Sequence, residues 1–212
     1  MKSFKLDSLA KDILLYLNNN SKVLLSVSLN SPRAVGDAVQ TEIAERAMPE
    51  VLQEFGVSVK DDFSRRSMED LAFSFNNRYY AIDVKTHNLD TDFNMPNLIS
   101  VRRLAQFYKN DDRNHFCLLI VSYKVRNGEI AYQDCFFKPI EWFDWKCLTI
   151  GALGWGQIQI ANANNLIFHQ YQRKDWMLEL CQKVEMFYDE EIGKIGERKS
   201  WFAQTRDYWL NK

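Results

Sequence analysis

The sequence predicts a mixed α/β (α+β) fold in which a β-hairpin lies between helices. Three observations support this fold class: apolar residues at helical spacing from Val39 to Phe55, two alternating strands joined at Asn76–Asn77, and helical periodicity from Arg173 onward. The chain of 212 residues is long enough for one sizeable hydrophobic core, and no linker, repeat or low-complexity stretch divides it. We therefore expect one domain spanning residues 1–212.

The composition is typical of a soluble globular protein, with 46% hydrophobic, 26% charged and 14% aromatic residues. The formal net charge of −1 provides no nucleic-acid signal by itself. The first residues mix charges with apolar side chains, so we expect no signal peptide, and no segment approaches the length of a membrane span. The four cysteines form no C-x-x-C pair, which predicts reduced thiols in a cytoplasmic protein and neither a zinc site nor a disulfide framework.

Periodicity and turn residues place the remaining elements. Helices are predicted over residues 4–17, 36–55 and 98–108 and over most of the chain from 173. Strands are predicted at residues 23–29, 116–124, 129–137 and 157–160. Asn127–Gly128 is a hairpin signal, and Asn97 is a good N-cap for the helix that follows it. We expect Gly193 and Gly196 to interrupt the last helix.

Two carboxylates are brought together by the predicted hairpin. Asn76–Asn77 separates two aromatic, alternating runs, and Asn tolerates the left-handed backbone that a two-residue turn requires. Such a turn pairs Phe75 with Arg78, which places Asp70 directly opposite Asp83. Directly paired side chains are about 4.5–5.5 Å apart at Cβ, where like charges repel. We therefore expect a cation between the two acids.

Alternation sorts the hairpin side chains onto two faces. One face is apolar core material and consists of Leu71, Phe73, Phe75, Tyr80, Ile82 and Val84. The other face has Asp70 and Asp83, and Lys85 joins them because it follows Asp83 by one strand period. Carboxylates with open positions left over suit Mg²⁺, and a nearby ammonium group can orient a metal-bound water or offset charge on a phosphoryl transition state. The alternative is an outer face with ordinary solvated charges.

Two other segments have the same acid-x-Lys pattern. Asp144-Trp145-Lys146 is preceded by Pro139, which disrupts a continuous hairpin, and Glu197-Arg198-Lys199 lies in a charged, helix-like segment. Only Asp83-Val84-Lys85 follows a hydrophobic hairpin, so it is the preferred candidate.

Gln40 is the polar exception in the helix predicted before the hairpin. At about 100° per residue it points into the apolar stripe, whereas Glu42 and Glu45 point away. A buried polar group needs a partner. Gln40 is therefore either a structural hydrogen bonder or a residue that reaches the Asp70–Asp83 site, and we include it among the candidate catalytic residues with both readings open.

The order of helix, hairpin, Asp-x-Lys, helix and strand resembles the PD-(D/E)XK nucleases. More closely, it resembles the blunt-cutting branch of the type II restriction endonucleases that includes HincII and EcoRV. The densest match is Ile82-Asp83-Val84-Lys85-Thr86-His87-Asn88, followed by 95–100 and 104–106, with Asp70 thirteen residues before Asp83. The segment 156–160 resembles the late strand of the family. The family often has Glu where Gln40 stands.

The resemblance implies a restriction-endonuclease-like fold, with a central mixed β-sheet flanked by helices and a long C-terminal helix. It also implies a homodimer that binds a short palindromic duplex DNA and hydrolyses one phosphodiester in each strand. Asp70 and Asp83 would bind Mg²⁺ together with the carbonyl of Val84, and Lys85 would assist the attacking water.

The same resemblance suggests residues that read DNA. Asn94 and Asn97 would lie at the DNA, and a loop would take the place of a major-groove recognition loop. This loop consists of Gly151, Ala152, Leu153, Gly154, Trp155 and Gly156. Its glycines either permit close backbone approach to bases or form only a turn. Arg102 and Arg103 are candidate phosphate contacts, the alternative being two solvated charges on a helix.

The leading hypothesis is thus a Mg²⁺-dependent, sequence-specific type II restriction endonuclease. One alternative is a DNA repair or junction nuclease of the same fold. The other is a catalytically inactive DNA-binding protein, which the intact Asp70, Asp83 and Lys85 disfavour.

Overall fold

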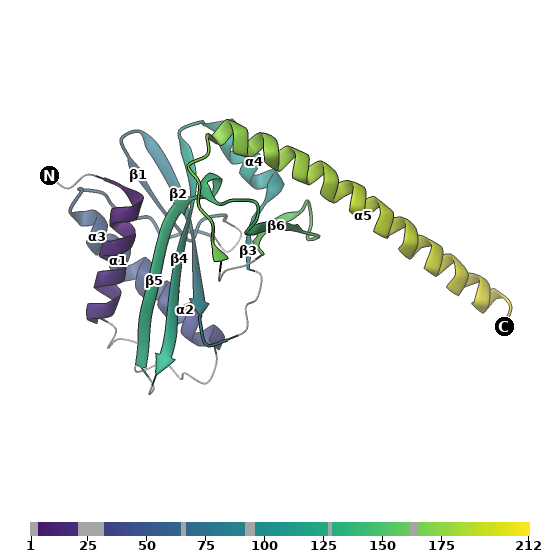
Figure 1. Ribbon diagram of the computed structural model, residues 1–212, viewed down its shortest axis with the longest axis horizontal. Coiled ribbons are helices and arrows are strands. Elements are labelled where there is room, and N and C mark those ends of the chain that lie inside the picture. The colour runs from purple at the N-terminus through teal and green to yellow at the C-terminus, as the bar shows by residue number, and fades with distance from the viewer. Residues whose placement is uncertain (1–3, 21–31, 65–66, 92–95, 127–128, 162–164) are drawn as a thin grey trace.

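A computed structural model describes residues 4–20, 32–64, 67–91, 96–126, 129–161 and 165–212 (Figure 1). The strand expected at 23–29, the candidate DNA contact Asn94 and the expected turn at Asn127–Gly128 lie outside these ranges.

The centre of the molecule is a four-stranded mixed sheet with the strand order β1-β2-β4-β5. Its strands are β1 (Leu71–Phe75), β2 (Arg78–Asn88), β4 (Asn114–Arg126) and β5 (Glu129–Pro139). Strands β2 and β4 run parallel, whereas the β1–β2 and β4–β5 pairs are antiparallel. The mixed α/β fold class and its central mixed sheet are therefore confirmed.

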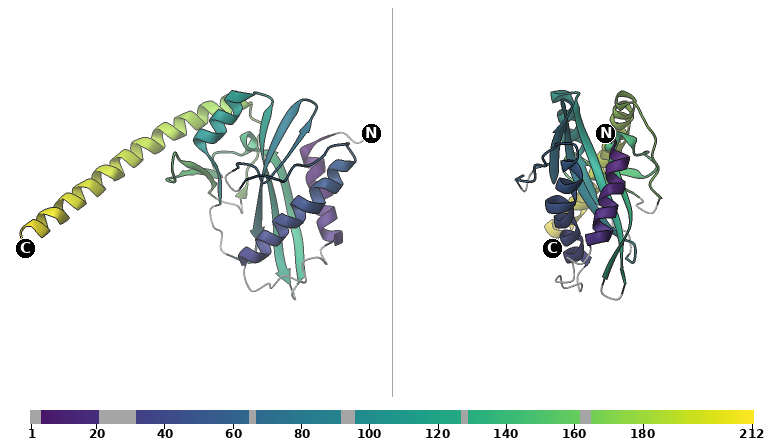
Figure 2. Two further views of the ribbon diagram at one scale, coloured as in Figure 1. Left: turned by 180° about the vertical axis from the view of Figure 1, so that it is seen from behind. Right: turned by 90° about the vertical axis from the view of Figure 1, so that its left-hand side faces the viewer.

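Helices cover one face of this sheet, as Figure 2 shows from two further sides. They are α1 (Leu6–Asn20), α2 (Pro32–Glu42), the π-helical turn η2 (Ile43–Ala47) and α3 (Met48–Gln53). Against them β2 buries Tyr80, Ile82 and Val84, in the alternation that the sequence predicts. The opposite face is not the solvated surface of the alternative reading, because Ala81 belongs to a second buried cluster there.

A second, three-stranded antiparallel sheet belongs to this other side of the molecule, with the order β3-β7-β6. Its strands are β3 (Asn97–Ser100), β6 (Leu148–Gly151) and β7 (Gln157–Ile160), and α4 (Val101–Asn110) follows β3 directly. The N-cap prediction for Asn97 is wrong, since Asn97 is the first residue of β3 and Ser100 holds the cap position. Residues 98–100 fit the helical periodicity, but pairing with β7, which is remote in sequence, holds this segment in a strand.

The helix predicted over 36–55 is present as α2, η2 and α3 in succession. Val39, Ile43 and Ala47 are buried as expected. Glu42, however, does not point to solvent and is only 7% exposed. The helix begins four residues earlier than predicted, which adds Val35 to the buried side, and Glu42 follows Val35 by seven residues on that side. Burial raises the pKa of Glu42, and Arg46 partly compensates at 3.4 Å.

The last helix, α5 (Arg173–Leu210), is continuous, so the predicted interruption at Gly193 and Gly196 is wrong. Glycine in a helix costs about 1 kcal/mol, which neighbouring turns can offset; Lys194, for example, pairs with Glu191 at 2.8 Å. The 3-10 turn η3 (Ile140–Trp142) follows β5 directly. Within the described ranges, no helix combines the length and the apolar character needed to cross a membrane.

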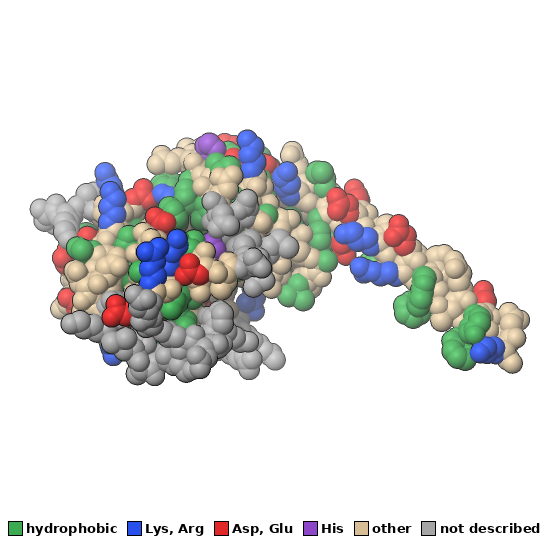
Figure 3. Space-filling model, turned by 60° about the horizontal axis from the view of Figure 1, so that its bottom comes forward, with side chains coloured by type: hydrophobic (Ala, Val, Ile, Leu, Met, Phe, Trp, Pro, Cys, Tyr) green, Lys and Arg blue, Asp and Glu red, His purple; other side chains and the backbone are tan. Residues whose placement is uncertain are grey.

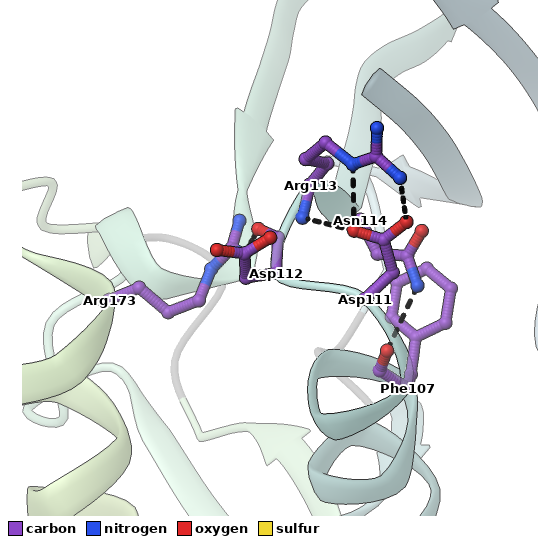
Figure 4. Close-up of polar contacts among 6 residues, drawn as sticks. All are labelled: Phe107, Asp111, Asp112, Arg113, Asn114 and Arg173. Carbon is purple, nitrogen blue, oxygen red and sulfur yellow. Dashed lines mark hydrogen bonds and ion pairs between the residues drawn. The ribbon is translucent and has the colours of Figure 1, made fainter. Parts of the chain in front are cut away.

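Polar contacts anchor the start of α5 near the end of α4 and the start of β4 (Figure 4). Arg173 donates from Nη1 to the carbonyl of Asp112 at 2.6 Å and from Nε to buried Glu141 at 3.0 Å. Asn114 donates to the carbonyl of Phe107 at 2.9 Å. The first part of the helix packs on the body, and its far half projects away from it (Figures 1 and 2).

Candidate active site

The β1–β2 hairpin has the register that the sequence predicts from Leu71 to Ile82. Asn76 and Asn77 have φ angles of 49° and 60°, the left-handed conformation of a two-residue hairpin turn. Phe75 pairs with Arg78 at the turn, and the ladder continues to the other end of β1. There the amide of Asp70 donates to the carbonyl of Ile82 at 2.9 Å, and the Asp70 carboxylate lies close enough to Asp83 to raise the pKa of that residue.

Asp83 is a buried carboxyl group, with 6% of the residue exposed. Its Oδ1 accepts a hydrogen bond from Lys85 Nζ at 2.5 Å. Its Oδ2 is buried and has no hydrogen-bond partner in the part of the chain that the structure describes. Burial raises the pKa of Asp83 to about 7, the charge of Asp70 adds to this rise, and Lys85 opposes it. Lys85 therefore compensates only part of the negative charge of Asp70 and Asp83.

Asp70 is positioned by the backbone of the neighbouring strand. Its Oδ2 accepts a hydrogen bond from the amide of Val84 at 2.8 Å. Val84 is itself buried against the helical layer, as is Ile82. Two buried residues of β2 therefore fix the geometry of Asp83, and a main-chain donor between Asp83 and Lys85 fixes that of Asp70.

Asp70 lines a hollow of about 500 Å³ between α2 and the segment that precedes β1. Gln40 lines the same hollow and is half-buried, so α2 brings it to the side of the site on which Asp70 lies. The hollow is acidic, since its walls also include Asp37, Glu45, Asp61 and Glu69. An acidic hollow of this size attracts a hydrated cation.

Gly36 and Glu69 are two nearby residues that the sequence analysis did not single out. A Cβ atom at Gly36 would lie 2.9 Å from Thr86 Oγ1, so glycine allows α2 to approach β2 directly after Lys85. Glu69 accepts a hydrogen bond from the Tyr79 hydroxyl at 3.2 Å; burial together with this carboxylate raises the pKa of Tyr79 to about 12. Two signals in the sequence could have identified them. Gly36 stands at the start of an amphipathic helix, and Glu69 is a second acid beside Asp70.

The chemistry of these donors fits a hard divalent cation. Within the described ranges, no group of three or more His, Cys, Asp or Glu side chains is arranged to hold a metal ion. A cation at this site would therefore have Asp70 and Asp83 as its carboxylate ligands, with a backbone carbonyl and water completing the shell, a ligand set that Mg²⁺ accepts. The buried Oδ2 of Asp83 supports this fit, because an unpaired buried carboxylate oxygen is costly unless a cation or a proton neutralises it.

Most of the predicted DNA-reading residues lie together around the second sheet and the start of α4. Asn97 is exposed, and its Oδ1 accepts a hydrogen bond from Gln159 on β7 at 2.6 Å. The residues from Gly151 to Gly156 join β6 to β7, with positive φ at Gly154 and Gly156. Arg102 lies 4.7 Å from the ring centre of Trp155, which is itself exposed.

Arg103 extends in another direction, from α4 toward the active site. Its Nη1 lies 3.5 Å from the carbonyl of Ser67, which lines the hollow together with Asp70. The α4 helix therefore connects the two groups of candidate residues. Arg102 lies beside the loop, and Arg103 lies beside the carboxylates.

The two other acid-x-Lys segments are accounted for by their local structure. Asp144 accepts hydrogen bonds from the amide of Lys146 at 2.7 Å and from the Tyr171 hydroxyl at 3.0 Å, and these contacts lower its pKa against the effect of burial. Glu197-Arg198-Lys199 lies within α5 and is exposed.

No protein-family model matches the sequence, and no curated protein matches it. Among solved structures, the chain is similar to the NlaIV restriction endonuclease. The two are 12% identical in sequence, the similarity covers 84% of this chain and 78% of that chain, and the TM-score is 0.48.

Proposed function

We propose that this protein is a Mg²⁺-dependent endonuclease that hydrolyses phosphodiester bonds in both strands of duplex DNA. The main support is the buried Oδ2 of Asp83, which has no hydrogen-bond partner among the described residues and lies beside Asp70 and Lys85. Two neighbouring acids with one lysine, which pairs with Asp83, leave a negative charge that a divalent cation would neutralise.

In this mechanism Asp70 and Asp83 hold the cation, with the carbonyl of Val84 as a further ligand. The bound ion would polarise the scissile phosphate and lower the pKa of an attacking water. The Val84 amide keeps Asp70 in place through its hydrogen bond of 2.8 Å. Lys85 supplies an ammonium group that orients the attacking water and offsets charge on the phosphoryl oxygens. Gln40, which lines the hollow with Asp70, is positioned to orient solvent there.

The DNA is held, in this proposal, by the surface around α4 and the β6–β7 loop. Arg102 and Arg103 would contact phosphates, and Asn97 together with the loop 151–156 would read base edges in the major groove. Because a single site cuts one strand at a time, cleavage of both strands at a short palindrome requires two copies related by a twofold axis. We therefore propose a type II restriction endonuclease that acts as a homodimer.

Plasmid and phage DNA incubated with the protein and Mg²⁺ test this function. We expect discrete fragments for the unchanged protein, no cleavage by Asp83→Ala or Asp70→Ala, and retained DNA binding in both variants. Lys85→Ala should lower the turnover rate more than the affinity for DNA. Asp62→Ala is the matched control, because Asp62 is an exposed acid outside the carboxylate pair.

The fragment pattern also separates the alternatives. A smear without discrete bands would indicate a nuclease without site specificity, such as a repair or junction enzyme. Binding without any digestion would indicate a DNA-binding protein that lacks catalysis. Cleavage retained in Asp83→Ala would reject the assignment of the active site.

A further inference from the structure

The far half of α5 exposes an apolar surface that no other part of the described structure covers. From residue 192 to the end of the chain, every residue except Thr205 is exposed. Seven large apolar side chains there are between 51% and 75% exposed: Ile192, Ile195, Trp201, Phe202, Tyr208, Trp209 and Leu210. Figure 3 shows hydrophobic side chains gathered at the far end of this projecting helix.

Three of these side chains, together with Tyr188, follow a seven-residue repeat that begins on the body. Tyr188, Ile195, Phe202 and Trp209 are spaced by seven residues and therefore lie on one side of the helix. The first of them already packs on the body, since the Tyr188 hydroxyl donates to the carbonyl of Trp155 at 2.8 Å. The side of α5 that packs on the body at Tyr188 therefore continues along the part of the helix that projects beyond the body.

The exposed area is large enough for a protein interface. An aromatic side chain offers about 150–250 Å² when fully exposed, so the four exposed aromatic residues alone present on the order of 500 Å². A stable interface buries roughly 800 Å² on each partner, and the largest apolar patch of a typical monomer is about 300–600 Å². Together with the three aliphatic residues, this surface reaches the size that a dimer needs.

The charges along α5 indicate which partner it binds. Residues 185–191 contain four acids and no basic residue: Glu185, Asp189, Glu190 and Glu191. Residues 192–212 contain five basic residues and two acids, a net charge of +3. Two such helices in parallel would place like charges together, whereas an antiparallel pair places the acidic stretch of each beside the basic stretch of the other.

We propose that α5 pairs in antiparallel orientation with α5 of a second copy of this chain. The seven-residue repeat sets the register, with Ile195 opposite the partner's Phe202 and Tyr188 opposite the partner's Trp209. In this register Glu191 lies opposite the partner's Arg206.

Analytical ultracentrifugation of the full chain over a concentration series tests this pairing. We expect a dimer that dissociates in the variant Phe202→Glu/Trp209→Glu. Leu178→Glu is the matched control, since Leu178 is 55% exposed on α5 but the register leaves it beyond the end of the partner's helix. Circular dichroism of each variant verifies that the body remains folded.

Charge reversal tests the antiparallel register. Arg206→Glu should weaken the dimer roughly tenfold or more, and adding Glu191→Arg should restore it, because the two residues face each other across the pair. A wild-type monomer, a Phe202→Glu/Trp209→Glu variant that stays dimeric, or a double reversal without recovery would each overturn the pairing. The oligomeric state of Asp83→Ala should be unchanged, so failure of the proposed chemistry and failure of this interface are measured separately.

Discussion

Substitution of Asp83 by Asn should change how the stability of the metal-free protein depends on pH. Burial raises the pKa of Asp83 from 3.8 to about 7. Between these values the folded protein keeps the proton that the unfolded chain has lost, so the free energy of unfolding falls as the pH rises from about 4 to about 7 and stays low above that. Each pKa unit corresponds to about 1.4 kcal/mol, which sets an upper limit of about 4 kcal/mol for this loss.

Asn has the same shape and no charge, so Asp83→Asn should remove this pH dependence. The buried amide group will lack some partners, at a cost of about 1–3 kcal/mol. At pH 8 in the presence of a chelator, the variant should therefore be more stable than the wild type by about 2 kcal/mol. For a chain of this length, that corresponds to a rise in Tm of roughly 4–8 °C.

Thermal and urea denaturation at pH 5 and pH 8, with and without Mg²⁺, provide the measurement. Saturation at about a hundred times the Kd should stabilise the wild type by about 2.7 kcal/mol and leave Asp83→Asn unaffected. Asp62→Asn, which changes an exposed acid, should behave as the wild type does. Equal pH profiles for wild type and Asp83→Asn, or a Mg²⁺ effect that survives in the variant, would refute this account of the buried carboxylate.

Three further substitutions test the fold. Asn77→Ala should cost about 1 kcal/mol of stability in urea denaturation, because φ is 60° there, while Asn77→Gly should cost nothing; equal values would contradict the turn assignment. Gly193→Ala should stabilise α5 by about 1 kcal/mol and slow amide exchange around residue 193, since nothing lies within 4 Å of the added Cβ; faster exchange would count against a continuous helix. Trp176→Ala should cost about 3–5 kcal/mol, because Trp176 is fully buried and stacks on Trp145 with ring centres 4.9 Å apart; a loss below 1 kcal/mol would contradict this packing.

The hairpin could be predicted from the sequence because its determinants are local. Two asparagines set the turn, and once the turn length is known, the pairing of Phe75 with Arg78 determines the other pairs as far as Leu71 with Ile82, next to which Asp70 and Asp83 lie. Strand β4 and the apolar stripe at Val39 and Ile43 were predictable for a similar reason, since periodicity within one segment identifies them.

Two of the errors occurred where the surroundings of a residue depend on a distant segment, and the third where a local propensity was outweighed by the neighbouring turns of the same helix. Asn97 satisfies the pattern of an N-cap, but pairing with β7 draws it into a strand. Glu42 satisfies the pattern of a solvated helix residue, but it is buried on the side of the helix that includes Val35, close to Tyr132 of β5. Gly193 and Gly196 favour an interruption locally, and the helix nevertheless continues through them.

The order of residues along one hairpin decided that two acids and a lysine share a face, because a strand repeats every two residues and a turn of known length leaves no freedom of register. Tertiary structure alone decided that Asp83 is buried, that Gln40 and Asp70 line one hollow, and that Arg102 and Arg103 diverge from α4 toward different surfaces. Each of these features depends on contact between segments that are far apart in the sequence. Packing on both faces of the central sheet sets that contact, and no local pattern does.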